Sequence, residues 1–165
     1  MSEDQKTGKV APTDSNPIGA GGNIFSYIGD LHVEDLYHLA SPQITQNEML
    51  GIKKRIEKAG QEGYDGVVVT HGTDTLEETA YYLELTLDVN IPIVITGAMR
   101  SSNEIGADGL ANLRSSLVVA VSDESSDKGV LVVMNDEVHT ATYVTKTHTT
   151  NVATFQTPTF GPIGL

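Results

Sequence analysis

The 165-residue chain contains no cysteine. Disulfide bonds and thiol chemistry are therefore excluded, while the redox compartment of the protein stays open. The sequence also lacks an apolar run long enough to predict a membrane-spanning helix. Its first residues show no signal-peptide pattern, so we expect a cytoplasmic protein. A signal peptide on a longer natural chain remains compatible with these observations.

Basic residues are scarce, with 10 Lys and Arg against 22 Asp and Glu and a formal net charge of −12. This balance argues against nucleic acid and anionic membranes as partners. The five histidines lack the spacing of a zinc site, and the carboxylates form no calcium loop. The glycines at 19–22 are not followed by the Gly-Lys-Ser/Thr of a phosphate loop. We therefore expect neither a metal nor a cofactor.

Strand-like and helix-like segments alternate along the chain, which predicts an α/β fold with a parallel sheet covered on both faces. Residues 1–24 are polar and glycine-rich and are expected to form a mobile loop, and residues 25–165 to form one α/β core. We expect strands at 32–40, 66–70, 91–96 and 130–134 and an edge-like strand at 142–145. Helices are expected at 45–59, at 76–87 and after 108.

Capping residues are expected to open each of these helices. Thr45 with Glu48, and Thr75 with Glu78, have the spacing of capping boxes, and Asp108 is placed to cap the third helix. The apolar stripe of that third helix is expected to face the core through Leu110, Leu113, Leu117 and Val121.

The segment from Val67 to Ala80 joins a buried strand to an amphipathic helix through a polar elbow. Gly72 permits a turn that a β-carbon would obstruct, and Thr73 and Asp74 lie at its mouth beside a helix N-terminus. Ligands of open α/β sheets bind at the carboxyl ends of the strands, where this elbow lies. From the residues alone, a ligand site and an ordinary polar connection remain equally open.

The elbow, T-H-G-T-D-T-L-E-E-T-A at 70–80, resembles the second threonine motif of the bacterial L-asparaginase (asparaginase/glutaminase) family. Further matching pieces follow in the family's order, from about Ser41 to the end of the chain. They are I-T-G-A-M-R at 95–100, A-D-G at 107–109, V-V-M-N-D at 132–136, V-T-K-T at 144–147, N-V-A-T-F at 151–155 and G-P-I-G at 161–164. The resemblance implies a doubly wound parallel sheet of the Rossmann-like or flavodoxin-like type.

The resemblance also implies a catalytic set of Thr73, Asp74 and Lys146, joined by hydrogen bonds. In the family, the aspartate position additionally holds the α-amino group of the substrate. Without the family, Lys146 would be interpreted as a solvated surface lysine, because nothing near it in the sequence suggests a site.

Four further positions are implied to contact the substrate. Ser41 matches a serine that binds the α-carboxylate, although it would otherwise be interpreted as a turn residue. Pro42 stands where the family usually has a polar residue, so one contact is lost or replaced. Gly72 precedes the threonine as expected, and Ala98 matches a position whose carbonyl faces the substrate amide nitrogen.

Relative to the family, the sequence lacks a first buried strand with its T-G-G-T-I-A motif, which carries the usual primary nucleophile, and a smaller C-terminal domain. Residues 1–165 are therefore expected to form an incomplete N-terminal domain. The parent reaction converts L-asparagine to L-aspartate and ammonia through a threonine nucleophile, without a cofactor, in a homo-oligomer. L-Glutamine is a second candidate substrate. Without the first threonine, we expect little or no activity from this chain.

Two other interpretations stay open. The chain could be a non-catalytic truncated fragment that binds amino acids weakly or associates with itself. It could also be a related amidase that acts on mischarged transfer RNA, but the net charge of −12 argues against this.

Overall fold

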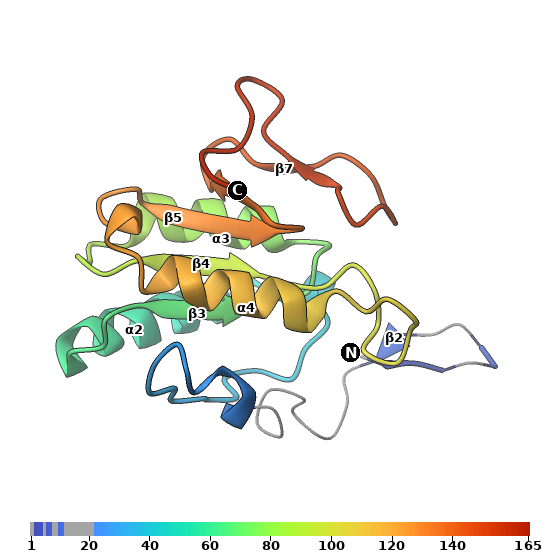
Figure 1. Ribbon diagram of the computed structural model, residues 1–165, viewed down its shortest axis with the longest axis horizontal. Helices are drawn as coiled ribbons and strands as arrows, with labels where there is room; N and C mark the ends of the chain where they lie inside the picture. Colours follow the sequence, from blue (N-terminus) through green and yellow to red (C-terminus); the bar gives the residue numbers. More distant parts are fainter. Residues whose placement is uncertain (1, 5, 8–9, 12–21) are drawn as a thin grey trace.

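A computed structural model describes residues 2–4, 6–7, 10–11 and 22–165 (Figure 1). Most of the loop expected at 1–24 therefore lies outside the described residues. Its described parts are a short antiparallel hairpin, β1 (Ser2–Glu3) with β2 (Val10–Ala11), and the first residues of the 3-10 turn η1 (Gly22–Phe25). Within the described part of the chain, no helix combines the length and hydropathy needed to span a membrane.

A four-stranded sheet forms the centre of the molecule, in the order β3 (Val67–Thr70), β4 (Ile93–Thr96), β5 (Val130–Met134) and β6 (Glu137–Thr140). The first three strands are parallel, and β6 runs antiparallel to β5. Every residue of β4 and β5 is buried, as their continuous apolar sequences predict. The strands expected at 66–70, 91–96 and 130–134 are thus confirmed.

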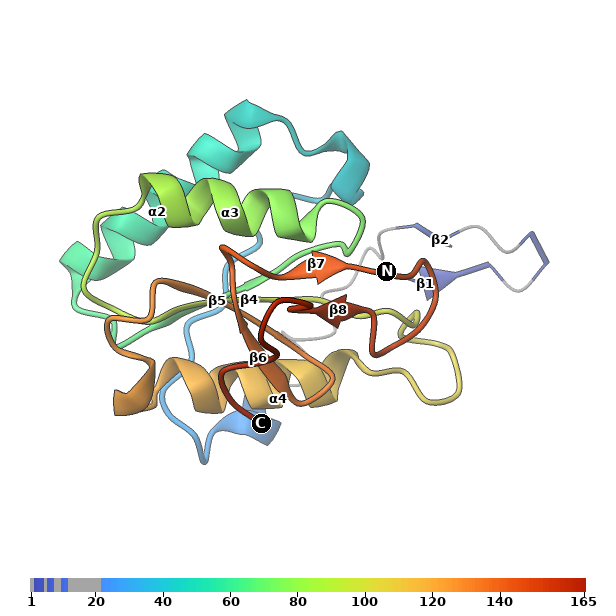
Figure 2. The same cartoon turned by 90° about the horizontal axis from the view of Figure 1, so that it is seen from above.

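Helices cover both faces of the sheet, which confirms the α/β fold class. Helices α2 (Gln46–Glu62) and α3 (Leu76–Thr86) lie on one face, and α4 (Gly109–Ala120) lies on the other (Figure 2). The larger hydrophobic core lies beneath α2 and α3, where Leu76 and Leu83 pack against Ile95 and Val132. This core fixes α3 on the sheet, and with α3 the elbow that precedes it.

The capping box predicted at the start of α2 is present. Thr45 accepts a hydrogen bond from the Asn47 amide at 3.2 Å, and Glu48 accepts one from the Thr45 amide at 2.8 Å. The capping box predicted for α3 is wrong. Thr75 makes no side-chain cap there, and its hydroxyl instead donates to the Ser41 carbonyl at 2.7 Å. The Thr75 side chain is thus held by Ser41, and in this orientation its oxygen accepts no amide hydrogen from the first turn of α3.

Helix α4 begins after Asp108 as predicted, but the Asp108 carboxylate does not cap it. It accepts hydrogen bonds from the backbone amides of Met99 and Arg100 instead, at 3.0 and 2.9 Å. The predicted apolar stripe is partly wrong, since Leu110 and Val121 are 51% and 52% exposed. The buried face of α4 consists of Asn112, Leu113, Ser116 and Ala120.

Asn112 explains why a partly polar face is buried there. Its side-chain amide donates to the Gly97 carbonyl at 3.0 Å, and its side-chain oxygen accepts from the Asn135 amide at 3.0 Å. These bonds tie α4 to the carboxyl ends of β4 and β5, and they satisfy the polar atoms that burial would otherwise leave unpaired.

Strand β6, which was not predicted, follows β5 through a tight turn. Asn135 and Asp136 have φ values of 52° and 62°, as a two-residue type I′ hairpin turn requires. The edge-like strand predicted at 142–145 is wrong except for Thr145, because 141–143 form a turn. The chain instead leaves the sheet and forms a separate hairpin of β7 (Thr145–Lys146) and β8 (Phe155–Gln156), visible beyond β5 in Figure 1.

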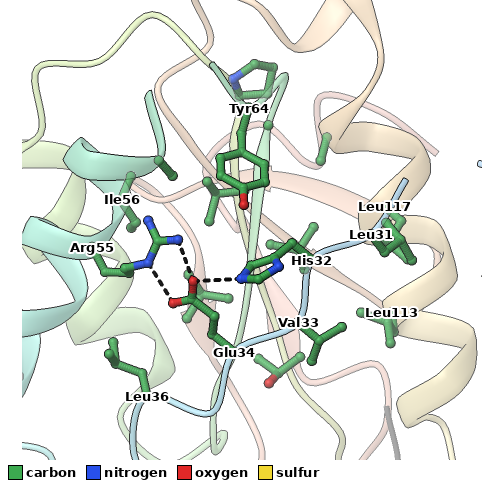
Figure 3. Close-up of a pocket in the computed structure, with 18 of the residues that line it drawn as sticks. Leu31, His32, Val33, Glu34, Leu36, Arg55, Ile56, Tyr64, Leu113 and Leu117 are labelled. Atoms are coloured by element: carbon green, nitrogen blue, oxygen red, sulfur yellow. Dashed lines mark hydrogen bonds and ion pairs between the residues drawn. The ribbon is translucent and has the colours of Figure 1, made fainter. Parts of the chain in front are cut away.

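The strand predicted at 32–40 is also wrong, since residues 31–40 have an irregular conformation. Strand β3, at the edge of the sheet, is separated from this segment by a groove of about 870 Å³ (Figure 3). Without a neighbouring strand, an extended segment cannot form a hydrogen-bonded ladder. The segment is held from the side instead, where Arg55 on α2 makes two hydrogen bonds to Glu34, at 2.6 and 2.5 Å.

Candidate active site

The polar elbow at the carboxyl end of β3 packs directly against Ser41. A β-carbon added to Gly72 would lie 2.7 Å from the Ser41 hydroxyl oxygen and 2.8 Å from its β-carbon, so the close approach requires glycine. The buried Ser41 hydroxyl accepts a hydrogen bond from the Asp74 amide at 3.2 Å. Together with the bond from Thr75 to the Ser41 carbonyl, this fixes the conformation of the elbow.

Lys146 reaches the elbow from the β7–β8 hairpin, 72 residues further along the chain than Asp74. Its Nζ lies 3.0 Å from the Thr73 hydroxyl oxygen and 3.2 Å from Asp74 Oδ1. The structure therefore brings the three predicted catalytic residues into one hydrogen-bonded cluster. Sequence spacing alone could not place Lys146 there.

The members of this cluster differ in exposure. The Lys146 side chain is 15% exposed, whereas the Asp74 side chain is 65% exposed. The lysine is therefore largely withdrawn from water beside the Thr73 hydroxyl, while the Asp74 carboxylate is accessible to a ligand. Such an arrangement can exchange a proton between amine and hydroxyl and can bind a cationic group at the carboxylate.

Glu77, in the first turn of α3, was not predicted as part of the site. Its carboxylate accepts hydrogen bonds from the Lys146 backbone amide and, at 3.2 Å, from the Thr145 hydroxyl. Its sequence position allowed only the general inference that an acidic residue favours a helix N-terminus. The contact with Lys146 spans 69 residues, and no local pattern indicates it.

His71, which was also not predicted as part of the site, connects the elbow to α3 through its two ring nitrogens. Its Nδ1 lies 2.7 Å from the Gly72 carbonyl, which can only accept, so Nδ1 carries the proton. Its Nε2 then accepts from the Thr79 hydroxyl, 3.0 Å away. Burial lowers the pKa of His71 below its ordinary value of 6.5, although the Gly72 carbonyl and the charge of Glu78 oppose this shift. The neutral form is therefore the one that the structure favours.

Two residues predicted to contact the substrate, Pro42 and Ala98, take no part in the hydrogen bonds that join Thr73, Asp74 and Lys146. Pro42 is exposed in the 3-10 turn η2 (Ser41–Gln43), and Ala98 is exposed after β4. Gly97, the residue before Ala98, packs against the elbow: a β-carbon there would lie 2.5 Å from the His71 carbonyl and 3.2 Å from Thr73 Cγ2. Among the described residues, no group of three or more histidine, aspartate or glutamate side chains converges to hold a metal ion.

The fold and the cluster define a class of molecule: an α/β protein with a hydroxyl, a carboxylate and an amine in contact at the carboxyl edge of its sheet. The comparisons with known proteins give this class a family. The family description "Asparaginase, N-terminal" matches residues 1–165, and the chain belongs to the asparaginase family.

Individual relatives agree with this assignment. The chain is 44% identical over 137 residues to L-asparaginase 2 of Escherichia coli, a match that covers 83% of this chain and 39% of that protein. It is 40% identical over 160 residues to a glutaminase-asparaginase of Pseudomonas fluorescens, covering 96% of this chain and 44% of the relative. The chain thus spans less than half the length of these relatives.

A solved structure is similar over most of the fold. The crystal structure of a probable cytoplasmic L-asparaginase from Campylobacter jejuni has a TM-score of 0.85 and 42% sequence identity. The match covers 89% of this chain and 46% of that one. Identity at this level supports both the sheet topology and the family assignment.

Proposed function

We propose that this chain carries part of the catalytic machinery of an L-asparaginase, as the incomplete N-terminal domain of such an enzyme. The reaction is the hydrolysis of L-asparagine to L-aspartate and ammonia. One observation carries the proposal: Lys146 Nζ lies within hydrogen-bond distance of both the Thr73 hydroxyl and the Asp74 carboxylate. The similarity to an L-asparaginase and to a glutaminase-asparaginase supports the same reaction and suggests L-glutamine as a second substrate.

Each residue of the cluster has a chemical role in this proposal. The amine of Lys146 takes up the proton of the Thr73 hydroxyl, which makes that oxygen a better nucleophile toward the amide carbon of the substrate. Attack forms a bond from the threonine oxygen to the carbonyl carbon, the bond to nitrogen breaks, and ammonia leaves after taking up the proton. Water then attacks the carbonyl carbon of the resulting ester, the bond to the threonine oxygen breaks, and L-aspartate is released as that oxygen regains a proton. The exposed Asp74 carboxylate binds the α-ammonium group of the substrate.

The remaining predicted residues have lesser roles. Ser41 and Gly72 shape the elbow through their mutual contact, and Ser41 is too buried to reach a ligand without a local opening. Pro42 and Ala98 border the site from the exposed loops after 40 and 96. We expect low activity from the chain alone and a homo-oligomeric assembly for the whole enzyme.

Two measurements test the proposal together: ammonia release from L-asparagine and L-glutamine, and calorimetric titration with L-aspartate. Wild-type chain is compared with Asp74→Asn and Lys146→Ala. We expect weak binding of L-aspartate that Asp74→Asn weakens at least tenfold, as loss of a charged hydrogen-bond partner would do. Binding unaffected by Asp74→Asn, or no binding and no turnover, would contradict the assignment. Turnover at an ordinary enzyme rate would contradict the expectation of low activity.

A further inference from the structure

Lys146 does not belong to the central sheet that positions Thr73 and Asp74. It lies on the two-residue strand β7, and within the described chain β7 pairs only with β8. The backbone of β3 therefore does not determine where the lysine amine lies. Some other contact has to hold β7 against the elbow, because a separation of 3.0 Å between Lys146 Nζ and the Thr73 oxygen leaves little tolerance.

Glu77 provides that contact with both of its carboxylate oxygens. Oε1 accepts from the Thr145 hydroxyl, and Oε2 accepts from the Lys146 backbone amide. The Lys146 amide faces away from β8, because the next amide, that of Thr147, donates to the Thr154 carbonyl. Without Glu77, the amide would have no partner in the hairpin.

We infer that Glu77 is a positioning residue, which holds the backbone of Lys146 so that its amine meets Thr73. Thr73 and Glu77 are four residues apart, on the elbow and in the first helical turn that follows it. Both ends of Lys146, its backbone amide and its Nζ, are thus attached to one short segment of the chain. The spacing of amine and hydroxyl therefore depends directly on this segment.

Glu78 offers a matched control for the effect of charge. It lies in the same helical turn and carries the same charge, but its side chain is exposed and its charge acts on His71. If Glu77 acted only through the helix dipole, Glu78 would have a similar effect. A specific role predicts that only changes at Glu77 affect Lys146.

The test measures how fast an acylating reagent modifies each lysine in the folded chain, by peptide mass spectrometry. Lys58, 66% exposed, serves as the reference, and Lys53, 19% exposed and paired with Glu57, reports general loosening. We expect Glu77→Ala to raise the labelling of Lys146 relative to Lys58 about tenfold. Glu77→Gln should give an intermediate rise, since its amide oxygen can accept one of the two bonds. Glu78→Ala should give none.

The catalytic importance of Glu77 rests on the proposed function, but the labelling of Lys146 can be measured without any turnover. A wild-type chain that neither binds nor hydrolyses amino acids would defeat the proposed function and leave the labelling result standing. Unchanged Lys146 labelling in Glu77→Ala and Glu77→Gln would overturn the inference, and so would a rise shared by Lys53. Where ammonia release is measurable, Glu77→Ala should lower kcat more than it changes KM, because Asp74 still binds the substrate.

Discussion

At the scale of single residues, the contact between Gly72 and Ser41 is the tightest point of the elbow. Gly72→Ala would place a methyl group within 2.8 Å of two Ser41 atoms, and Ser41 is buried with a side chain too short to move aside. We expect the free energy of unfolding to fall by about 1–3 kcal/mol, as overpacking does. Urea unfolding measures it. Gly29→Ala is the control, because nothing lies within 4 Å of its added carbon, and an equal loss there would contradict the explanation.

The protonation of His71 gives a second prediction at this scale. Its pKa in the folded chain is lowered by burial, so the unfolded chain takes up a proton first as the pH falls through about 6.5. Stability is therefore constant above that pH and decreases below it, until the folded pKa is reached. The decrease from this group is at most about 1.4 kcal/mol per pH unit.

Urea unfolding between pH 5 and pH 8 checks this slope in the wild type and in His71→Gln. The variant should lose part of the pH dependence. Some slope will remain, because burial also lowers the pKa of His139. Identical slopes in the two proteins would show that His71 does not titrate as described.

At the scale of secondary-structure elements, the β5–β6 turn is open to improvement. Both turn residues have positive φ, and Asp136 at 62° adopts a conformation that glycine adopts with less strain. Asp136→Gly creates Asn-Gly, the preferred pair of a type I′ turn, at the expense of an exposed hydrogen bond from Ser115. We expect a stability gain of about 0.5–1 kcal/mol in thermal unfolding. Asp136→Ala should lose stability instead, and a gain there would contradict the argument.

The elements also show what the sequence could predict. Strands β3, β4 and β5 were predictable because burial on both faces leaves a continuous apolar pattern, and α2 because its capping box is local. The segment 32–40 was not, because an extended pattern becomes a strand only beside a partner, and its side of β3 is a groove. The capping of α3 was mispredicted for a similar reason, since the Thr75 hydroxyl bonds to a residue 34 positions away.

The residues of the candidate site likewise divide into those that a local pattern predicts and those that depend on long-range contacts. Thr73, Asp74 and Gly72 could be proposed from a local strand–elbow–helix pattern, and the family resemblance added Lys146 and Ser41. Glu77 was missed because its role is set by a hairpin far along the chain. His71 was missed because its two hydrogen bonds depend on burial that the sequence does not show.

At the scale of the whole molecule, β3 has no strand partner on its side away from β4 among the described residues, and we expect this edge to mediate self-association. The amides of Val67 and His71 donate to the carbonyls of Pro92 and Thr96 on the β4 side. Because successive backbone amides of a strand point to opposite sides, the Thr70 amide faces away from β4, toward the groove. Unpaired strand edges beside apolar side chains favour pairing between copies. We expect concentration-dependent association in sedimentation velocity.

Thr70→Pro removes this amide hydrogen while leaving the bonds to β4 intact. The association should weaken about fivefold, as loss of one hydrogen bond of about 1 kcal/mol predicts. Thr70→Ser keeps the amide and serves as the control. Equal association of the two variants, with unchanged circular dichroism, would place the contact elsewhere on the surface.

The position of the β7–β8 hairpin also affects the order in which parts of the molecule unfold. The elbow is anchored to the main core through β3 and α3, whereas Lys146 is carried by a hairpin outside the four-stranded sheet, which enters the core only through Phe155 and the adjoining Val144 among the described residues. Peripheral elements of this kind open at a smaller free-energy cost than the sheet does. A brief excursion of the hairpin would withdraw the amine while Thr73 and Asp74 kept their places. Heat or denaturant would then dismantle the site before the fold, and the site would reassemble each time the hairpin returned.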